Sequence, residues 1–289
     1  MSKTTNIGNN FIKTNLYNDA EISGRIYAQL CHLFPEDLLS EQKDRFFQHT
    51  FHVMHKLMAT KYHLENYKKI EEAQYVQAKQ QFKKNPHETR EALELIFEIE
   101  AFLFQIKSSL DMLVKLLRPA IGDNIVRTKT YSNKGDDLIN GLNQYKNKKG
   151  VNTVAVDNLI YLIEDHKKTW ISNVITLRDE LNHDKGLREY KFMPRRLPNG
   201  EVVVIKPTLK KMNTLDSLKQ VYSNNLIFHQ DFMVLSLALT FPSQMFLDKE
   251  DPQIAIKMYG DKIGKYIVFC LKMHLPTEGE LSQEPYFGG

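Results

Sequence analysis

The segment ETREALELIFEIEAFLFQIKSSLDMLVKLL, residues 88–117, decides the fold of this chain. It holds no proline or glycine, and its large apolar side chains recur on nearly every side of a helix. A helix that is apolar nearly all round is normally buried inside a protein. Asn85-Pro86 precedes the segment and Arg118-Pro119 follows it, so we expect the helix to run from Glu88 to Leu117. The sequence therefore predicts a central helix that other elements cover on most sides.

Further helical patterns lie on both sides of this segment. Three of them are long: one covers about 35–84, one begins at Asn152 or Thr153 and reaches about Asn182, and one covers about 213–240. Three shorter helical patterns cover 19–33, 136–145 and 251–273. Leu197-Pro198-Asn199-Gly200 precedes the β-branched run Val202–Ile205, which predicts a β-hairpin near 188–207. We predict an all-α fold, a helical bundle with long antiparallel helices and one inserted β-hairpin.

The chain divides into four parts by composition. Residues 1–18 are polar and rich in asparagine, and we expect them to be flexible. Residues 19–85 form an N-terminal helical extension, residues 86–275 form the main helical domain with the hairpin, and residues 276–289 form an irregular tail. No internal repeat is found.

Composition excludes several classes of protein. The 289 residues carry a net charge of +4 with a pI near 8.8, which permits nucleic-acid binding without demanding it. Two isolated cysteines, Cys31 and Cys270, provide neither a disulfide framework nor a zinc site. The longest apolar stretch, 232–241, is half the length of a membrane span, and the N-terminus lacks a signal-peptide core. We expect a soluble, cytoplasmic protein that does not bind membranes.

The residues that carry chemistry are Arg178-Asp179-Glu180-Leu181-Asn182-His183, at the end of a predicted helix that Gly186 closes. The arginine offers a planar fork of donors that matches phosphate oxygens, and the histidine can accept or donate a proton near neutral pH. These two groups suffice to cleave RNA without a metal. On a straight helix they point about 140° apart, so a loosened last turn or a second subunit must bring them together.

This motif resembles the R-x4-6-H motif of the HEPN superfamily, and the resemblance covers roughly residues 88–240. It implies a helical bundle, usually a homodimer, and in many members a metal-independent endoribonuclease of toxin–antitoxin, anti-phage or CRISPR systems. That activity leaves a 2′,3′-cyclic phosphate and needs no cofactor. RNA and an antitoxin protein are the implied partners. The resemblance assigns catalysis to Arg178 and His183, with Asp179 and Asn182 positioning them. Lys107 and Asp111 on the preceding helix are supporting candidates, and Asp111 is expected either to face Arg178 or to form a simple salt bridge.

Other groups of residues in the sequence allow different functions to be considered. His49, His52, His55 and His63 share one helix, but their spacing suits a metal only in pairs. Glu180 and His183 form a Glu-x-x-His pair, yet no second such pair exists for a di-iron site. Nucleotide-binding loops and a serine hydrolase elbow are absent from the sequence. Tyrosines 62, 67 and 75 can stack on bases or line a half-buried helix flank. The alternative function is a non-catalytic helical module that binds RNA, nucleotide or a protein partner.

Overall fold

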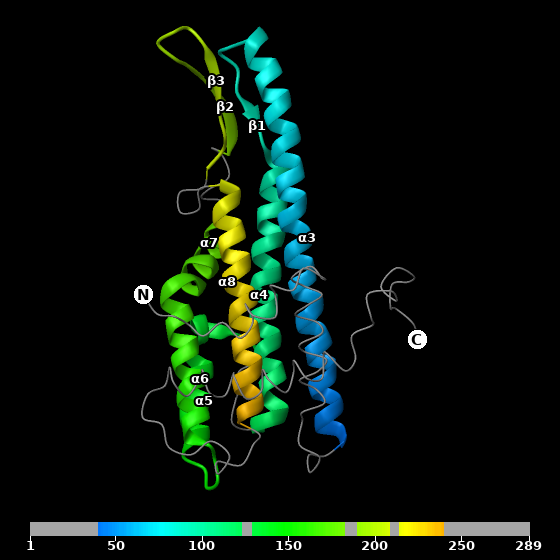
Figure 1. Ribbon diagram of the computed structural model, residues 1–289, viewed down its shortest axis with the longest axis vertical. Helices are drawn as coiled ribbons and strands as arrows, with labels where there is room; N and C mark the ends of the chain where they lie inside the picture. The colour runs from blue at the N-terminus through cyan, green and yellow to red at the C-terminus, as the bar shows by residue number, and fades with distance from the viewer. Residues whose placement is uncertain (1–39, 123–128, 183–189, 209–213, 240–289) are drawn as a thin grey trace, which may run out of the picture.

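The computed structural model of the chain describes residues 40–122, 129–182, 190–208 and 214–239. These residues are mostly helical, with a small antiparallel sheet of three strands, which confirms the predicted helical class (Figure 1). The elements, in chain order, are α3 (Ser40–Lys84), β1 (Arg90–Glu91), α4 (Leu93–Ile121), η1 (Ser132–Gly135), α5 (Asp136–Lys146), α6 (Thr153–His166), η2 (Lys167–Ile171), α7 (Ser172–Asn182), β2 (Lys191–Arg196), β3 (Val202–Ile205) and α8 (Thr214–Ala238).

The long helices α3 and α4 form an antiparallel pair that runs along the whole described body (Figure 1). The turn between them is held by Glu88, whose carboxylate accepts hydrogen bonds from Gln81 and Asn85, each at 2.8 Å. Val53, Leu57 and Leu64 of α3 belong to the same hydrophobic core as the buried face of α4. The predicted helical extension, where it is described, therefore shares its core with the main helical domain.

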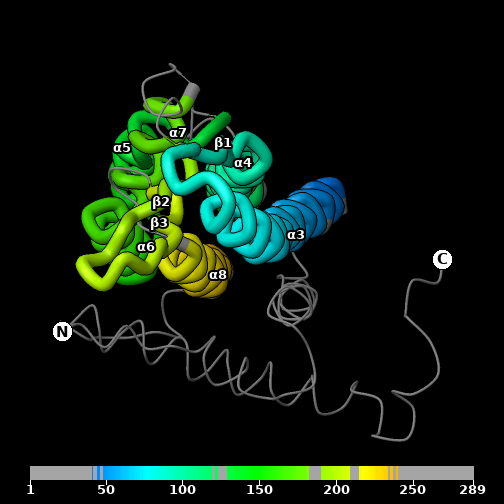
Figure 2. Tube along the Cα trace, turned by 90° about the horizontal axis from the view of Figure 1, so that it is seen from above, coloured from blue at the N-terminus to red at the C-terminus, as the bar shows by residue number. Residues whose placement is uncertain are grey.

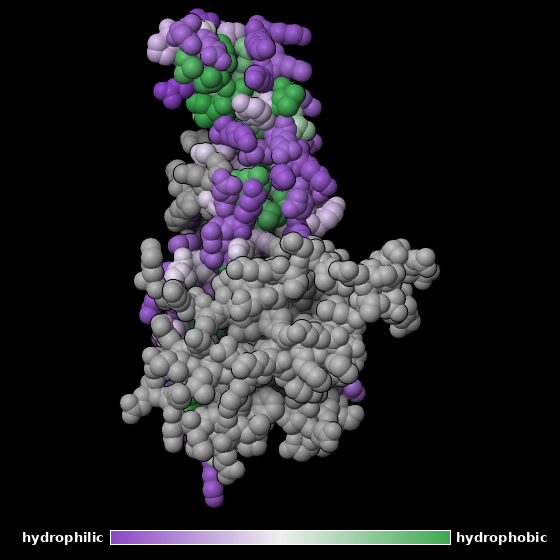
Figure 3. Space-filling view, viewed as in Figure 1, coloured by the Kyte–Doolittle hydropathy of each residue, from purple (hydrophilic) through white to green (hydrophobic). Residues whose placement is uncertain are grey.

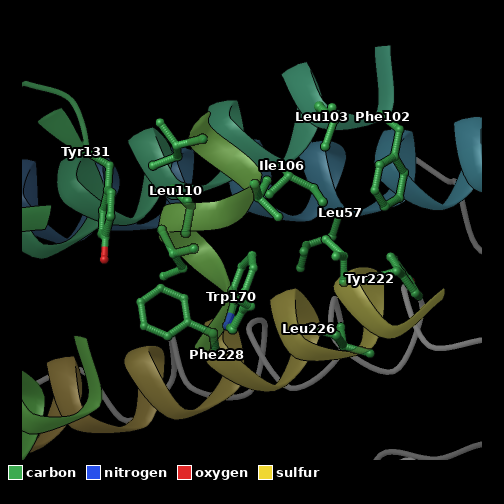
Figure 4. Close-up of a cluster of buried hydrophobic side chains, with 14 of the residues drawn as sticks. Leu57, Phe102, Leu103, Ile106, Leu110, Tyr131, Trp170, Tyr222, Leu226 and Phe228 are labelled. Atoms are coloured by element: carbon green, nitrogen blue, oxygen red, sulfur yellow. The ribbon is translucent and has the colours of Figure 1, made fainter. Parts of the chain in front are cut away.

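The remaining helices cover one side of this pair. Figure 2, seen from above, places α4 and α8 between α3 on one side and α6 on the other. Figure 4 shows the core where these elements meet, with Trp170 and Phe228 beside Leu110 of α4. All three side chains are buried, and each such burial stabilises the fold by roughly 1.5–3 kcal/mol.

The central helix departs from its prediction in two ways. It begins at Leu93, because Arg90 and Glu91 extend into strand β1, and it continues past Pro119 to Ile121 before Gly122 adopts a positive φ. A proline in the last turn removes one hydrogen bond and does not stop the helix. The helix is also not covered on most sides: Leu93 is 53% exposed, Phe97 62% and Phe104 59%. Its outer face is apolar and open.

The predicted helix of 152–182 is an uninterrupted helical run of three elements, α6, η2 and α7, with a change of pitch between them. Asn152 caps α6 by accepting a hydrogen bond from the backbone N–H of Ala155 at 3.1 Å. After His166 the backbone takes a π-helical turn through Ile171 and then returns to α-helix in α7. An extra residue in one turn changes the direction in which the later side chains of the helix point around its axis. Such turns occur often at functional sites. The described part of this helix reaches Asn182, and the helix end that the sequence predicts there stays a prediction.

The hairpin is confirmed, and its turn differs from a two-residue Asn-Gly turn. Gly200 N–H donates to the Leu197 carbonyl at 2.9 Å, and Leu197 N–H donates to the Glu201 carbonyl at 2.8 Å. With Gly200 at φ 84°, this is a three-residue loop in which the glycine takes the left-handed position. β2 lies between β1 and β3, and half-exposed valines of β3 contribute to the apolar area at the hairpin end (Figure 3).

Several predicted features lie outside the described residues. These are the flexible start, the helices at 19–33 and 251–273, the tail at 276–289, both cysteines and Gly186. Within the described ranges, no helix combines the length and the apolarity that crossing a membrane requires.

Candidate functional site

Arg178 lies on the core-facing side of α7. Its neighbours on the same helix face, Val174 four residues before it and Leu181 three residues after it, are both buried. The Arg178 side chain is 25% exposed, and its Nε donates to the Asp179 carboxylate at 3.0 Å. Nη2 bonds to the same carboxylate oxygen at 2.5 Å. One edge of the guanidinium is therefore fixed by the adjacent residue, and part of the group remains accessible to a ligand.

The described part of the helix that carries Arg178 reaches Asn182, and the second motif residue follows it in the sequence. His183 lies outside the described residues, and so does the side chain of Asn182. The structure therefore places one half of the predicted pair, Arg178 with Asp179, and its relation to His183 stays a prediction.

The two supporting candidates on α4 bind each other. Lys107 forms an ion pair with Asp111, four residues later on the same helix. Asp111 also accepts a hydrogen bond from the backbone N–H of Tyr131 at 2.7 Å. Among the described residues, no hydrogen bond or ion pair joins Asp111 to Arg178, although α4 packs against α7. Of the two expected roles for Asp111, the structure thus shows the salt bridge.

A second cation reaches the motif helix from η1. The Lys134 amine donates to the Thr176 hydroxyl at 3.0 Å, two residues before Arg178 in sequence. Lys134 and Asn133 both have positive φ values, 56° and 47°, which non-glycine residues adopt rarely and at a cost in energy. Sequence reasoning did not single out Lys134. The only local signal was Asn133-Lys134-Gly135, a combination that tolerates left-handed backbone.

Behind the motif helix lies a buried cluster of aromatic and imidazole rings. The Trp170 indole N–H donates to Nδ1 of His166 at 2.7 Å, and the His166 ring lies 4.9 Å from that of Phe228. Burial lowers the pKa of His166 to about 4 and that of His229 to about 4. Both imidazoles are therefore neutral at pH 7, and His166 carries its proton on Nε2. This cluster fixes the π-helical turn that precedes Arg178.

A buried polar network ties the hairpin to α3. The Glu71 carboxylate, 2% exposed, accepts from the Lys206 amine at 2.7 Å and from the Tyr67 hydroxyl at 3.3 Å. The hydroxyls of Tyr67 and Tyr190 are 2.8 Å apart. Tyr67 is buried, which excludes it as a platform for stacked bases, whereas Tyr62 is 63% exposed. The network fixes Tyr190, the first described residue after the motif segment. Sequence reasoning missed it because the bonds of Tyr67 to Tyr190 and of Glu71 to Lys206 each join residues more than a hundred positions apart.

The histidines of α3 do not gather into a metal site. The rings of His49 and His52 are 6.2 Å apart, and His63 Nδ1 bonds to Glu98 at 2.8 Å. Within the described ranges, no group of three histidine, cysteine, aspartate or glutamate side chains is placed to hold a metal ion.

A small pocket lies beside the π-helical turn. Its volume is about 310 Å³, and Lys167 and Asp136, which form an ion pair, are among its lining residues. The pocket is lined by Asp136, Ile139, Asn140, Glu164, Lys167 and Lys168. None of the predicted site residues lines it.

Comparison with known proteins adds no relative: no protein-family model, no curated protein and no solved structure matches this chain.

Proposed function

We propose that this chain is a metal-independent endoribonuclease of the HEPN type, acting in prokaryotic defence or as a toxin. One observation carries the proposal. Arg178 is held by Asp179 on the inner side of α7, remains 25% exposed, and lies five residues before His183 in the sequence. A guanidinium that is held on one edge keeps the donors of its other edge for a phosphate oxygen. The resemblance of the six-residue motif supports the same assignment.

The proposed reaction is transfer of the phosphate to the 2′-hydroxyl of the same nucleotide. The 2′-oxygen attacks phosphorus, the bond to the 5′-oxygen breaks, and a 2′,3′-cyclic phosphate and a 5′-hydroxyl result. An imidazole of His183 takes the 2′ proton or supplies the proton of the leaving group. The Arg178 guanidinium stabilises the extra negative charge on the phosphorane. Asp179 positions the arginine, and no other reactant is consumed.

The local charges support binding of an anion. Lys134 reaches the motif helix at Thr176, a neutral partner, so its charge is not neutralised by that contact. Among the described residues, Lys134 forms no ion pair with a carboxylate. Thr176 and Arg178 are two residues apart on α7, so Lys134 adds positive charge near the motif helix on a different side from Arg178.

The test is cleavage of RNA by purified protein in EDTA. Arg178→Ala and His183→Ala are each expected to lower the rate at least a hundredfold, since loss of one charge-stabilising or proton-transferring group costs that much. His87→Ala, in the exposed turn between α3 and β1, is the matched control and retains the wild-type rate. Equal rates in all four proteins would refute the proposal.

The second candidate function is a non-catalytic module that binds RNA, nucleotide or a protein partner. The observation that favours it is the Arg178–Asp179 pair, which occupies two of the guanidinium donors. The remaining donors can bind a phosphate without catalysing a reaction. Under this alternative, Arg178→Ala weakens RNA binding in a filter assay, whereas neither wild type nor variant cleaves.

A further inference from the structure

Strand β3 lies at one edge of the small sheet. The strand order is β1-β2-β3, and among the described residues no strand pairs with the outer side of β3 (Figure 1). Such an edge presents backbone N–H and C=O groups to which another strand can bind. Natural edge strands usually carry a charge, a proline or a bulge that prevents this pairing. β3 carries none of them: its sequence is Val-Val-Val-Ile, and its register with β2 is unbroken.

The register of the hairpin determines which backbone groups of β3 point outward. Leu197 N–H donates to the Glu201 carbonyl at 2.8 Å and closes the hairpin. Hydrogen-bonded and non-hydrogen-bonded pairs alternate along an antiparallel ladder, so Val202 and Val204 occupy non-hydrogen-bonded positions. Pro194, which has no N–H, stands opposite Val204, as such a position allows. The N–H and C=O groups of Val202 and Val204 therefore point away from β2.

The side chains of β3 are apolar on both faces of the sheet. Val202 and Val204 point inward and pack against the core. Val203 and Ile205 point outward, and Ile205 stands opposite Met193, which is 39% exposed. Figure 3 shows this apolar area at the hairpin end with hydrophilic residues around it. A rimmed apolar area of this kind is typical of a surface that binds another protein.

Two free arginines lie beside this edge. Arg195 and Arg196 of β2 are both exposed, and in the described part of the chain neither guanidinium forms a hydrogen bond or an ion pair. Lys206, by contrast, is paired with Glu71. A strand added to β3 would lie about 10 Å from β2, a distance that an arginine and a glutamate side chain span together. Glu201 in the hairpin loop offsets only part of this charge, so the edge favours a partner with carboxylates.

We propose that the outer edge of β3 binds an extended segment of a partner protein in which acidic and β-branched residues alternate. The segment adds a strand to the sheet, and its carboxylates meet Arg195 and Arg196. A second copy of this chain fits less well, because pairing of two β3 edges gathers both arginine pairs on one short stretch of sheet. RNA also fits less well, because the outward side chains, Met193, Val203 and Ile205, offer no aromatic ring for stacking. This interface does not depend on the proposed ribonuclease activity.

Fluorescence anisotropy with a synthetic peptide tests the proposal on the full-length chain. The probe is a fluorescein-labelled peptide with blocked ends, about eight residues long, in which valine alternates with glutamate. It is expected to bind with a micromolar Kd. A peptide of the same length in which proline alternates with glutamate keeps the charge but loses half of the N–H donors, and it is expected to bind at least tenfold more weakly. Absence of binding by the valine–glutamate peptide, or equal binding by both peptides, overturns the proposal.

A substitution at Val204 tests whether the backbone of β3 makes the contact. Val204→Pro removes the outward N–H and leaves the bonds to β2, since an edge strand accepts proline at such a position. It is expected to weaken peptide binding at least tenfold. Val204→Thr keeps the N–H and the shape of the side chain, and as the matched control it retains the wild-type affinity. Circular dichroism and melting temperature are compared for both variants. A folded Val204→Pro variant that binds as the wild type does contradicts strand addition.

Charge reversal tests the acidic character of the partner without altering β3. Arg195→Glu combined with Arg196→Glu is expected to weaken binding of the valine–glutamate peptide at least tenfold and to favour a valine–lysine peptide instead. Lys148→Glu combined with Lys149→Glu changes the net charge equally in the exposed turn between α5 and α6, at the other end of the described body, and retains the wild-type affinity (Figure 1). An equal loss in both double variants would show unspecific attraction and overturn the proposal.

A labelled RNA oligonucleotide separates the two classes of partner. If the RNA binds the wild-type chain, is lost in the Arg195→Glu, Arg196→Glu variant, and the peptide does not bind, the edge is a nucleic-acid site and the proposal is overturned. Because peptide binding is measured without RNA cleavage, failure of the ribonuclease assay leaves this test intact, and the reverse also holds.

Discussion

Arg178 shows how a common residue type acquires a specific setting. An arginine five residues before a histidine occurs often by chance, and on a straight helix the two directions differ by about 140°. The structure adds that Arg178 lies between buried Val174 and Leu181 and that Asp179 holds its Nε. A guanidinium fixed on one edge loses little rotamer entropy when it binds a phosphate with its other edge. These facts strengthen the assignment of Arg178 and leave that of His183 to the activity assay.

His166 provides a prediction for stability against pH. Burial lowers its pKa to about 4, whereas in the unfolded chain it is near 6.5. Between these values the unfolded chain binds the extra proton, so the free energy of unfolding falls as the pH drops from 6.5 toward 4. For this one group, the loss between pH 7 and pH 4 is roughly 3 kcal/mol.

The measurement compares wild type with His166→Gln, which keeps an acceptor for the Trp170 N–H and cannot be protonated. Urea unfolding at several pH values should show the difference between the two proteins shrinking as the pH falls. The comparison cancels the contributions that other groups make to the pH dependence of stability. One of these groups is Asp231: burial raises its pKa to about 8, so its contribution to the free energy of unfolding rises as the pH falls. A difference that stays constant from pH 7 to pH 4 would show that His166 does not titrate as described.

At the scale of elements, helical periodicity predicted most of the described structure. The end of α3 at Lys84 and the hairpin around Asn199-Gly200 follow from local polarity and turn chemistry. Strand β1 was missed because Arg90 and Glu91 pair with β2, about a hundred residues away. The π-helical turn at Lys167–Ile171 was missed because periodicity predicts an unbroken α-helix there; Trp170 of this turn and His166 directly before it are both buried.

The ion pair of Lys206 with Glu71, which joins the end of the hairpin to α3, provides a prediction for stability. Glu71 is 2% exposed and depends on the Lys206 amine for its charge partner. Removing one partner leaves a buried, unpaired charge, which is more costly than removing both. We expect Lys206→Met to lower the free energy of unfolding by about 2 kcal/mol, and the same change to cost much less in a Glu71→Gln background.

The measurement is a double-mutant cycle. Denaturant unfolding is measured for the wild type, for the two single variants and for the double variant. A coupling energy of about 1–3 kcal/mol is expected for two residues in direct contact. Additive effects of the two substitutions would mean that the Lys206 amine spends its time in solvent, as its 39% exposure permits.

At the scale of the whole molecule, the arrangement of helices explains both successes and errors of prediction. The apolar pattern of residues 88–117 correctly predicted a central helix, but it could not tell which apolar side chains the rest of the chain covers. Phe97 and Phe104 are 62% and 59% exposed, whereas Phe102 and Leu103 on the same helix are buried. In the same way, the sequence singled out Arg178 but not Lys134, because the bond of Lys134 to Thr176 of α7 joins residues that are 42 positions apart.

The most direct test of the proposed chemistry uses an RNA in which a single scissile nucleotide carries 2′-deoxyribose. In EDTA, wild-type protein is expected to cleave the all-ribose RNA to a 2′,3′-cyclic phosphate and a 5′-hydroxyl, identified by mass spectrometry. The RNA with the single 2′-deoxy substitution should remain intact at that position, because the attacking oxygen is missing. Cleavage of both RNAs at the same position, or products that carry a 5′-phosphate, would contradict attack by the 2′-hydroxyl at a site built on Arg178 and His183.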